Sequence, residues 1–237
     1  MKAVRSSFMQ MLLFVRRDRM FLASCLAPVF AGLLFKFGLP AVDRAASGWM
    51  GHASVLIPYF GLFDLFLSML SPVMVCFAAA MVMLEEHDDR IDRYLFATTL
   101  GRKGYLISRI GIPASAALLT TLILLPMFSL TPLSMAETVF LSAMGALQGV
   151  ITALMIVTLS TNKLEGMAVT KASSLTMMGA LVPYFVTDRI QYAASFLPSF
   201  WVGKAIYGSE WIYMFPAVLS AMIWICILLI KYLRKRS

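Results

Sequence analysis

The sequence predicts an all-α integral membrane protein with six transmembrane helices, and three observations support this fold class. Of the 237 residues, 60% are hydrophobic and 14% are charged, and the mean hydropathy is +0.84, which is far more apolar than in soluble domains. The apolar residues form continuous runs of about 20 residues, the length of a membrane-crossing helix, and not the short alternating segments of a membrane barrel. The Lys and Arg residues gather on one side of these runs. We therefore expect a single membrane domain over residues 1–237.

The first elements are a surface helix and two spans. Residues 1–19 place apolar side chains at helical spacing among cations, which predicts a helix in the membrane interface. The first span is expected at 20–39, which is too long for the apolar core of a signal peptide and is therefore retained. The second is expected at 63–84, because a helix over the whole apolar run would exceed the hydrocarbon thickness. Four more spans are expected at 106–128, 135–159, 172–187 and 211–230.

The distribution of the 20 Lys and Arg residues predicts the orientation. Sixteen of them lie in the N-terminal arm, the loops after spans two and four, and the C-terminal tail, with Arg109 at the start of span three counted in the loop before it, and all fall on one side of the predicted spans. Cytoplasmic loops carry an excess of Lys and Arg. We expect a multi-pass protein of a bacterial cell (inner) membrane with both termini in the cytoplasm.

The loop at 85–105, between spans two and three, is unlike the others. It contains five of the twelve acidic residues, followed by several cations. As one helix it would pair Glu86 with Arg90 and Asp89 with Arg93 at the favourable i,i+4 spacing.

The same helix would have an apolar face. Ile91, Tyr94, Leu95 and Thr98 fall on one side of it, and a basic turn near Gly101 would end it. An amphipathic helix of this kind is suited to docking in a groove of a soluble partner. A solvated connecting loop is the alternative.

Three stretches resemble type-two ABC exporter permeases, and the small fluoroquinolone-export permeases among them. The first is the acidic and basic run from Glu86 with the sequence LFATTLGRKGYLISR at 95–109, which is similar to the coupling-helix segment of that family. Thr99 stands where the family usually has Pro, and Arg90 where it usually has Gly. The sequence NKLEG at 162–166 resembles a cytoplasmic segment of these permeases, and FLPSFW at 196–201 resembles their external segment before the last span.

This resemblance implies a transport subunit, not an enzyme. It would export an amphiphilic drug, peptide or lipid as a homodimer or heterodimer, beneath which ATP-binding subunits dock and hydrolyse ATP with magnesium. No cofactor or metal is expected in this chain, which lacks the G-x-x-x-x-G-K-[ST] phosphate loop. The expected coupling residues are Glu86, Asp89, Arg90, Ile91, Arg93, Tyr94, Leu95, Thr98, Thr99 and Arg102, with Asn162, Lys163, Glu165 and Gly166 in the second cytoplasmic loop.

An enzymatic alternative rests on Asp88, Asp89 and Asp92. Their DDxxD pattern is like the acidic motif with which membrane prenyltransferases hold magnesium and diphosphate, and carboxylates suit that cation. The other acidic residues form no second cluster of this kind.

An ion-coupled secondary transporter is the other alternative. It requires ionisable groups within the membrane, for which Lys36 and Asp64 are the candidates. Both fall near the predicted external ends of their spans, where long side chains extend to the interface.

Two further features carry no separate function. Cys25, Cys76 and Cys226 lie in apolar runs without metal-ligand spacing, and they are expected to pack as small apolar residues. The net charge of +8 follows from the cytoplasmic loops, so no nucleic-acid partner is expected.

Overall fold

The computed structural model describes residues 6–11, 13, 19–50, 54, 56–208 and 211–235. Every regular element among these residues is helical, as the sequence predicts. Two elements, η1 and η3, are π-helical, and η2, η4, η5 and η6 are 3₁₀-helical. In order, the elements are α2 (Arg19–Leu33), η1 (Leu34–Gly38), α3 (Leu39–Met50), η2 (Ile57–Tyr59), α4 (Phe60–Asp88), α5 (Ile91–Ala97), α6 (Gly101–Leu106), η3 (Ile107–Gly111), α7 (Ile112–Phe128), α8 (Met135–Leu159), α9 (Lys163–Ser174), η4 (Leu175–Leu181), α10 (Val182–Phe185), η5 (Arg189–Ala194), α11 (Pro198–Tyr207), η6 (Trp211–Tyr213) and α12 (Met214–Lys235).

Five helices of the described chain are long and apolar enough to cross a membrane, which makes this a multi-pass membrane protein. They correspond to the expected first, second, third, fourth and sixth spans, and the fourth agrees at both ends. The second is longer than expected, because α4 runs without a break through Pro72 to Asp88. Its 29 residues extend over about 43 Å, so its end projects beyond a hydrocarbon layer of about 30 Å. The five are Ala23–Gly48, Ile57–Asp88, Gly101–Phe128, Met135–Leu159 and Trp211–Lys235.

The expected fifth span at 172–187 is not among these five helices. The chain there forms α9, η4 and α10 in series. The first part is polar, with Lys163, Glu165 and Lys171 in α9, and the middle part tightens to 3₁₀ geometry. A single apolar α-helix is therefore absent from this described segment.

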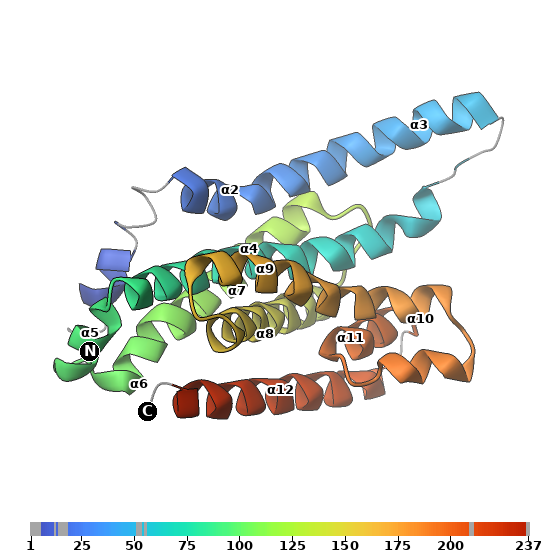
Figure 1. Cartoon of the computed structure of the whole chain (residues 1–237). Helices are drawn as coiled ribbons and strands as arrows, with labels where there is room; N and C mark the ends of the chain where they lie inside the picture. The colour runs from blue at the N-terminus through green and yellow to red at the C-terminus, as the bar shows by residue number, and fades with distance from the viewer. Residues whose placement is uncertain are drawn as a thin grey trace.

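The core of the bundle lies between α4 and α8. The two helices run side by side in the middle, with α2 and α3 along one outer side and α12 along another (Figure 1). Gly145 and Gly149 of α8 face α4, and a Cβ at Gly149 would lie 2.8 Å from the Pro72 carbonyl oxygen and 2.9 Å from Cys76 Sγ. Small residues at this spacing let membrane helices approach closely. The glycine pair therefore sets the contact at the centre of the molecule.

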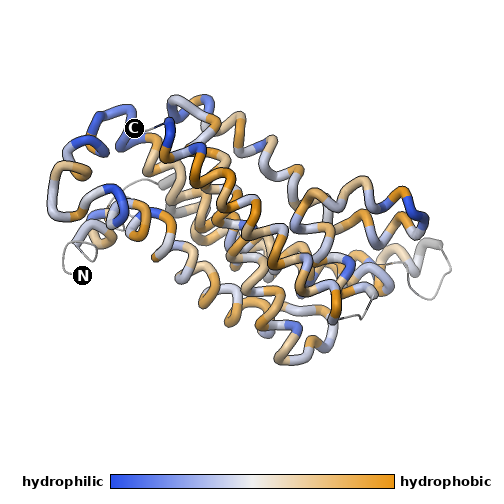
Figure 2. The backbone as a smooth tube through the Cα atoms, turned by 90° about the horizontal axis from the view of Figure 1, so that it is seen from below, coloured by the Kyte–Doolittle hydropathy of each residue, from blue (hydrophilic) through white to orange (hydrophobic). Residues whose placement is uncertain are grey.

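Several chain segments meet at one end of the bundle, which we name the polar end: residues 85–103, 160–166 and 231–235. Hydrophilic residues gather there, beside the mark for the C-terminus (Figure 2). Residues 6–11 lie at this end too (Figure 1). These residues and Leu13 are helical, and the rest of the expected interfacial helix at 1–19 lies outside the described residues, apart from Arg19 at the start of α2.

Candidate docking site

A sharp turn separates α5 from α4 at the polar end. The Asp89 N–H donates to the Glu85 carbonyl (3.0 Å), and the Arg90 N–H donates to the His87 carbonyl (3.0 Å). Arg90 then has φ 60°, in the left-handed region that residues with a Cβ enter only at a cost. This is the position at which the resemblance leads us to expect glycine. The backbone conformation there is the one that glycine adopts most readily.

The expectation of one continuous helix beginning at Glu86 is therefore wrong. Glu86 lies in the last turn of α4, and the turn at Asp89 and Arg90 separates it from α5. The i,i+4 pairs of Glu86 with Arg90 and of Asp89 with Arg93 need an unbroken helix. Glu86 bonds instead to Arg109.

The seven-residue helix α5 has an outer and an inner side. Tyr94 is 75% exposed and Ile91 is 42% exposed, so both project from the molecule. Leu95 and Phe96 are half-buried and pack against the apolar core. The expected apolar face is thus divided, because Tyr94 and Ile91 are available to a partner and Leu95 belongs to the chain's own packing.

Asp92 anchors the inner side of α5. Its carboxylate is buried, accepts a hydrogen bond from the Arg93 N–H (2.8 Å) and pairs with His87 Nδ1 (2.7 Å). Burial raises the pKa of Asp92, and the Arg93 N–H and guanidinium partly oppose this. The pair fixes α5 to the last turn of α4.

A second turn joins α5 to α6. The Thr98 hydroxyl donates to the Leu95 carbonyl (2.7 Å) and accepts from the Leu100 N–H (3.3 Å). Gly101 follows with φ 62°, which glycine adopts without strain. A left-handed residue thus precedes α5, and another begins α6.

The segment between α8 and α9 is also tightly ordered. Asn162 caps α9 by accepting from the Glu165 N–H (2.9 Å), and Glu165 accepts from the Thr161 N–H and hydroxyl (both 2.7 Å). These hydrogen bonds, that of the hydroxyl first, lower the pKa of Glu165. Gly166 lies against Leu84, where a Cβ would clash. The sequence at 162–166 thus forms a capped helix start packed on α4.

Polar contacts join this segment to the end of α4. Lys163 Nζ pairs with Glu85 (2.6 Å), and the Lys163 N–H donates to the Asp88 carboxylate (3.1 Å). Lys235 of α12 donates to the carbonyls of Thr158 (2.9 Å) and Ser160 (2.6 Å) at the end of α8. The two predicted cytoplasmic segments therefore form one continuous surface.

Beneath this surface lies a buried ion pair. Arg109 of η3 is 1% exposed, and its Nε donates to both carboxylate oxygens of Glu86 (3.1 and 3.0 Å). The Tyr105 hydroxyl donates to the same carboxylate (2.9 Å), and Arg109 Nη1 donates to the Ser7 carbonyl (2.7 Å). The cluster ties α4, α6, η3 and residues 6–11 together.

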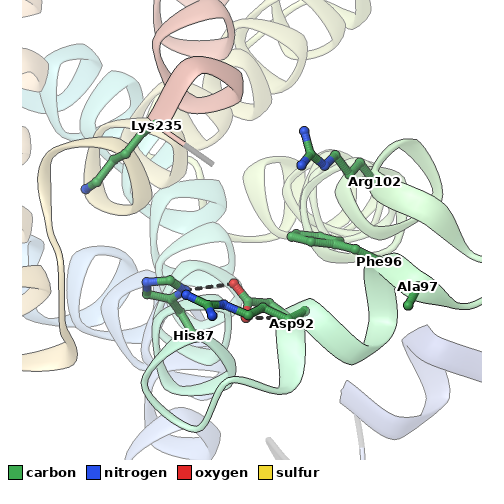
Figure 3. Close-up of a pocket in the computed structure, with 7 residues that line it drawn as sticks. His87, Asp92, Phe96, Ala97, Arg102 and Lys235 are labelled. Atoms are coloured by element: carbon green, nitrogen blue, oxygen red, sulfur yellow. Dashed lines mark hydrogen bonds and ion pairs between the residues drawn. The ribbon is translucent and has the colours of Figure 1, made fainter. Parts of the chain in front are cut away.

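A cleft of about 590 Å³ opens between α5 and α12. His87 and Asp92 lie on one side of it, Phe96 and Arg102 on another, and Lys235 of α12 lines a third side (Figure 3). The Arg102 guanidinium lies 5.9 Å from the centre of the Phe96 ring, within the range of a cation–π contact. The cleft is cationic and has an aromatic wall.

All fourteen of the expected coupling residues lie at this end, in three different environments. Asp89, Arg90, Ile91, Arg93, Tyr94, Thr98, Thr99 and Arg102 are exposed, Glu86 and Leu95 face inward, and Asn162, Lys163, Glu165 and Gly166 form the capped start of α9. The sequence analysis missed the pairing partner Arg109. Its signal was a lone Arg inside an apolar run, because a charge at membrane depth nearly always has a partner.

The three Asp residues of the DDxxD pattern do not converge. Asp88 accepts from the Lys163 N–H, whereas Asp92 is buried against His87 and the Arg93 N–H. Asp89 lies in the turn and is exposed. In the described part of the chain, no three His, Cys, Asp or Glu residues are arranged to hold a metal ion. The geometry gives no support to a magnesium–diphosphate site.

Comparison with known proteins yields one match. The family described as fluoroquinolones export permease protein Rv2686c-like matches residues 12–229, which is most of the chain. No curated protein and no solved structure matches.

Proposed function

The chain belongs to the Rv2686c-like family of fluoroquinolone export permeases, an ABC permease family, and from this membership we propose that it is the membrane-spanning subunit of an ATP-driven exporter. An ATP-binding subunit docks at the polar end and hydrolyses ATP, and an amphiphilic compound of the fluoroquinolone kind moves outward. The observation that carries the proposal is α5, a short helix at the polar end with an exposed outer side, separated from α4 by the left-handed residue Arg90.

The surface around α5 fits a docking site. Tyr94 and Ile91 project from it, and Leu164 at the start of α9 is 80% exposed on the neighbouring segment. Exposed apolar side chains rimmed by charges mark sites of protein interaction. Arg93 and Arg102 supply charges around them. ATP itself would be bound by the partner, because this sequence has no phosphate-binding loop.

The buried ion pair explains how movement of α5 would reach the spans. α5 connects to α4 and α6 through turns of only a few residues, and the contact of Glu86 with Arg109 joins the end of α4 to η3, the segment between α6 and α7. A displacement of α5 by the ATP-binding subunit would therefore move α4 and α7 together. Such a rigid unit is the kind of element that nucleotide binding biases between two states.

We also propose that the chain crosses the membrane six times. The series of α9, η4 and α10 follows α8 and runs along the bundle from the polar end to the opposite end (Figure 1). Its length is roughly 38 Å, which exceeds a hydrocarbon layer of about 30 Å. Lys171 in α9 is exposed, and helical side chains point toward the N-terminal end, here the polar end.

Charge supports placing the polar end in the cytoplasm of a bacterial inner membrane, with both termini there. Six crossings bring the two ends of the chain to the same side. The N-terminal arm, residues 85–109, residues 160–171 and the C-terminal tail hold sixteen of the twenty Lys and Arg residues.

A second permease copy, or a paralogue, would complete the transporter. The span Ala23–Gly48 and the span Trp211–Lys235 are mostly exposed along their apolar lengths. Lipid covers part of such a surface in any membrane protein. A pathway between two chains needs two copies that each contribute an exposed face.

The two ionisable groups that would favour ion coupling already have structural roles. Asp64 accepts hydrogen bonds from the N–H groups of Leu130 (2.8 Å) and Thr131 (2.9 Å) and from the Thr131 hydroxyl (2.5 Å). Lys36 donates to the Met127 carbonyl. Both side chains thus fasten the α7–α8 connection and the end of α7.

The test is a charge placed on the docking surface. Tyr94→Asp should preserve insertion and folding, because Tyr94 is exposed, and should abolish ATP-dependent export by leaving a carboxylate in the apolar contact with the partner. Export is measured as drug efflux from inverted or intact vesicles with the ATP-binding subunit present.

Ile190→Asp is the matched control, since Ile190 is 73% exposed at the opposite end of the bundle. It should retain export. Equal export by wild-type protein and Tyr94→Asp would remove α5 from the coupling mechanism. Loss of export in Ile190→Asp alone would contradict the proposed orientation, in which the ATP-binding subunit docks at the polar end.

A further inference from the structure

An apolar groove of about 340 Å³ lies beside the polar end, between the helices of three spans. α6 and η3 form one wall, α8 the floor and α12 the other wall. Between Lys103 and Gly111 the groove follows about 12 Å of helix. Its lining residues are Lys103, Leu106, Ile107, Ile110, Gly111, Val150, Leu154, Ile225 and Leu229.

The groove has one charged end. Lys103 is exposed and lies at the end nearest α5, one helical turn before Leu106 and Ile107. Among the described residues that line the groove, none is acidic and the rest are aliphatic or glycine. The lining therefore combines a long apolar trough with a single positive charge.

A narrow neck adjoins both the groove and the cationic cleft. Phe96, Tyr105 and Tyr232 line a narrow neck of about 10 Å³ between the groove and the cationic cleft. The neck shares Leu106 with the groove, and it shares Phe96 and Arg102 with the cleft. The lining residues of the groove belong to the membrane-crossing helices Gly101–Phe128, Met135–Leu159 and Trp211–Lys235. The groove is therefore placed along the spans, near their ends at the polar end, where acyl chains surround the protein.

We propose that this groove binds an anionic phospholipid of the cytoplasmic leaflet, with an acyl chain along the trough and Lys103 beside the phosphate. The identity of the leaflet rests on the proposed orientation of the transporter. Charge complementarity selects the occupant, because acyl chains surround the spans and a Lys at the headgroup level attracts an anionic lipid over a zwitterionic one.

The chain contains a second groove that serves as an internal comparison. It has a similar volume, about 300 Å³, between α7 and α8, and it is lined by Ala114, Ser115, Leu118, Ala143, Ala146, Leu147 and Val150. None of these described residues is charged. This groove should accept acyl chains without regard to the headgroup.

The experiment is native mass spectrometry of the full chain in mild detergent. The protein is incubated with an equimolar mixture of phosphatidylglycerol and phosphatidylcholine that have identical acyl chains. Wild-type protein should retain phosphatidylglycerol about fivefold over phosphatidylcholine. Lys103→Gln should bring this ratio close to one. Ile107→Trp, which fills the trough from an exposed position, should reduce the retention of both lipids.

Matched variants separate this site from general effects. Lys171→Gln removes another exposed cation, and Leu118→Trp fills the second groove, so both should keep the wild-type ratio. A ratio of one in wild-type protein, or an equal loss in Lys171→Gln, would overturn the proposal. So would disulfide cross-linking of two copies through Ile107→Cys in a chain with Cys25 and Cys226 changed to Ser, because a second copy would then cover the groove.

The measurement needs no ATP-binding subunit. Loss of the lipid preference with intact ATP-driven export would remove the lipid site alone. A selective lipid site in a chain that associates with no ATP-binding subunit would instead count against the proposed function.

Discussion

Arg109 keeps a full positive charge inside the bundle, where its partners decide the stability of the fold. Glu86 and the Ser7 carbonyl accept its hydrogen bonds, and Tyr105 donates to the same carboxylate. Removing one member of a buried ion pair is far more costly than replacing both, because the remaining charge is left without compensation.

We therefore predict that Arg109→Met alone lowers the free energy of unfolding by about 3 to 5 kcal/mol. The double change Glu86→Leu with Arg109→Met should recover much of this loss. Denaturant unfolding in mixed micelles measures both, with Lys171→Met as the exposed control at about 0.5 kcal/mol or less. A double variant no more stable than Arg109→Met would show that the charge pair itself contributes the stability.

Arg90 has a backbone conformation that residues with a Cβ rarely adopt. Its left-handed conformation costs a residue with a Cβ roughly 1 to 2 kcal/mol, and glycine avoids this cost. Arg90→Gly should therefore leave the protein as stable as the wild type or up to about 1 kcal/mol more stable, since glycine also loses more entropy on folding.

Arg93→Gly is the matched change three residues later inside α5, where glycine should destabilise by about 1 kcal/mol. Thermal unfolding of the two variants compares them directly. Equal destabilisation by both would mean that Arg90 does not have the left-handed backbone conformation.

At the scale of elements, the closest helix packing lies between α4 and α8. Gly145 lies so near the Ser68 carbonyl that a Cβ would clash, and Gly149 is in the same position against Pro72 and Cys76. Gly145→Ala and Gly149→Ala should each destabilise the bundle by about 1 to 3 kcal/mol through overpacking.

Gly61→Ala provides the control in α4, because a Cβ there meets nothing within 4 Å. It should be neutral or stabilising by up to about 1 kcal/mol, owing to the higher helix propensity of Ala. Unfolding in mixed micelles distinguishes the three variants. Destabilisation by Gly61→Ala equal to that of Gly145→Ala would argue against the close approach.

The spans with uniform apolar runs were predictable, and the exceptions have identifiable causes. Residues 135–159 agree at both ends because the capping box of Ser134 and Glu137 starts α8. The prediction of a single apolar helix at 172–187 differs from the structure, because the helical series there begins in the polar residues of α9 and tightens to a 3₁₀-helix. Hydropathy reports apolar length and carries no information on helix type.

The candidate site was predictable in its location but not in its geometry. The charged loop at 85–105 and the segment at 162–166 do lie together. Propensity and charge spacing gave no sign of the break at Arg90, because propensity gives Arg no preference for a left-handed conformation and the charge spacing favoured a continuous helix. The inward face of Leu95 depends on tertiary packing that no local pattern encodes.

On the scale of the whole molecule, the polar end is joined to the helix bundle. The proposed docking helix α5, the ion pair of Glu86 with Arg109 and the packing of α4 on α8 connect the polar end to the core through direct contacts. This connection has a function only if another protein acts on α5. The association with an ATP-binding chain is therefore the central claim.

The most direct measurement is purification of the chain from its native membranes in a gentle detergent, followed by identification of the proteins that accompany it. We predict an ATP-binding subunit in one-to-one ratio with the permease, and its loss when the chain carries Tyr94→Asp. Recovery of the folded chain without any ATP-binding protein would contradict the account.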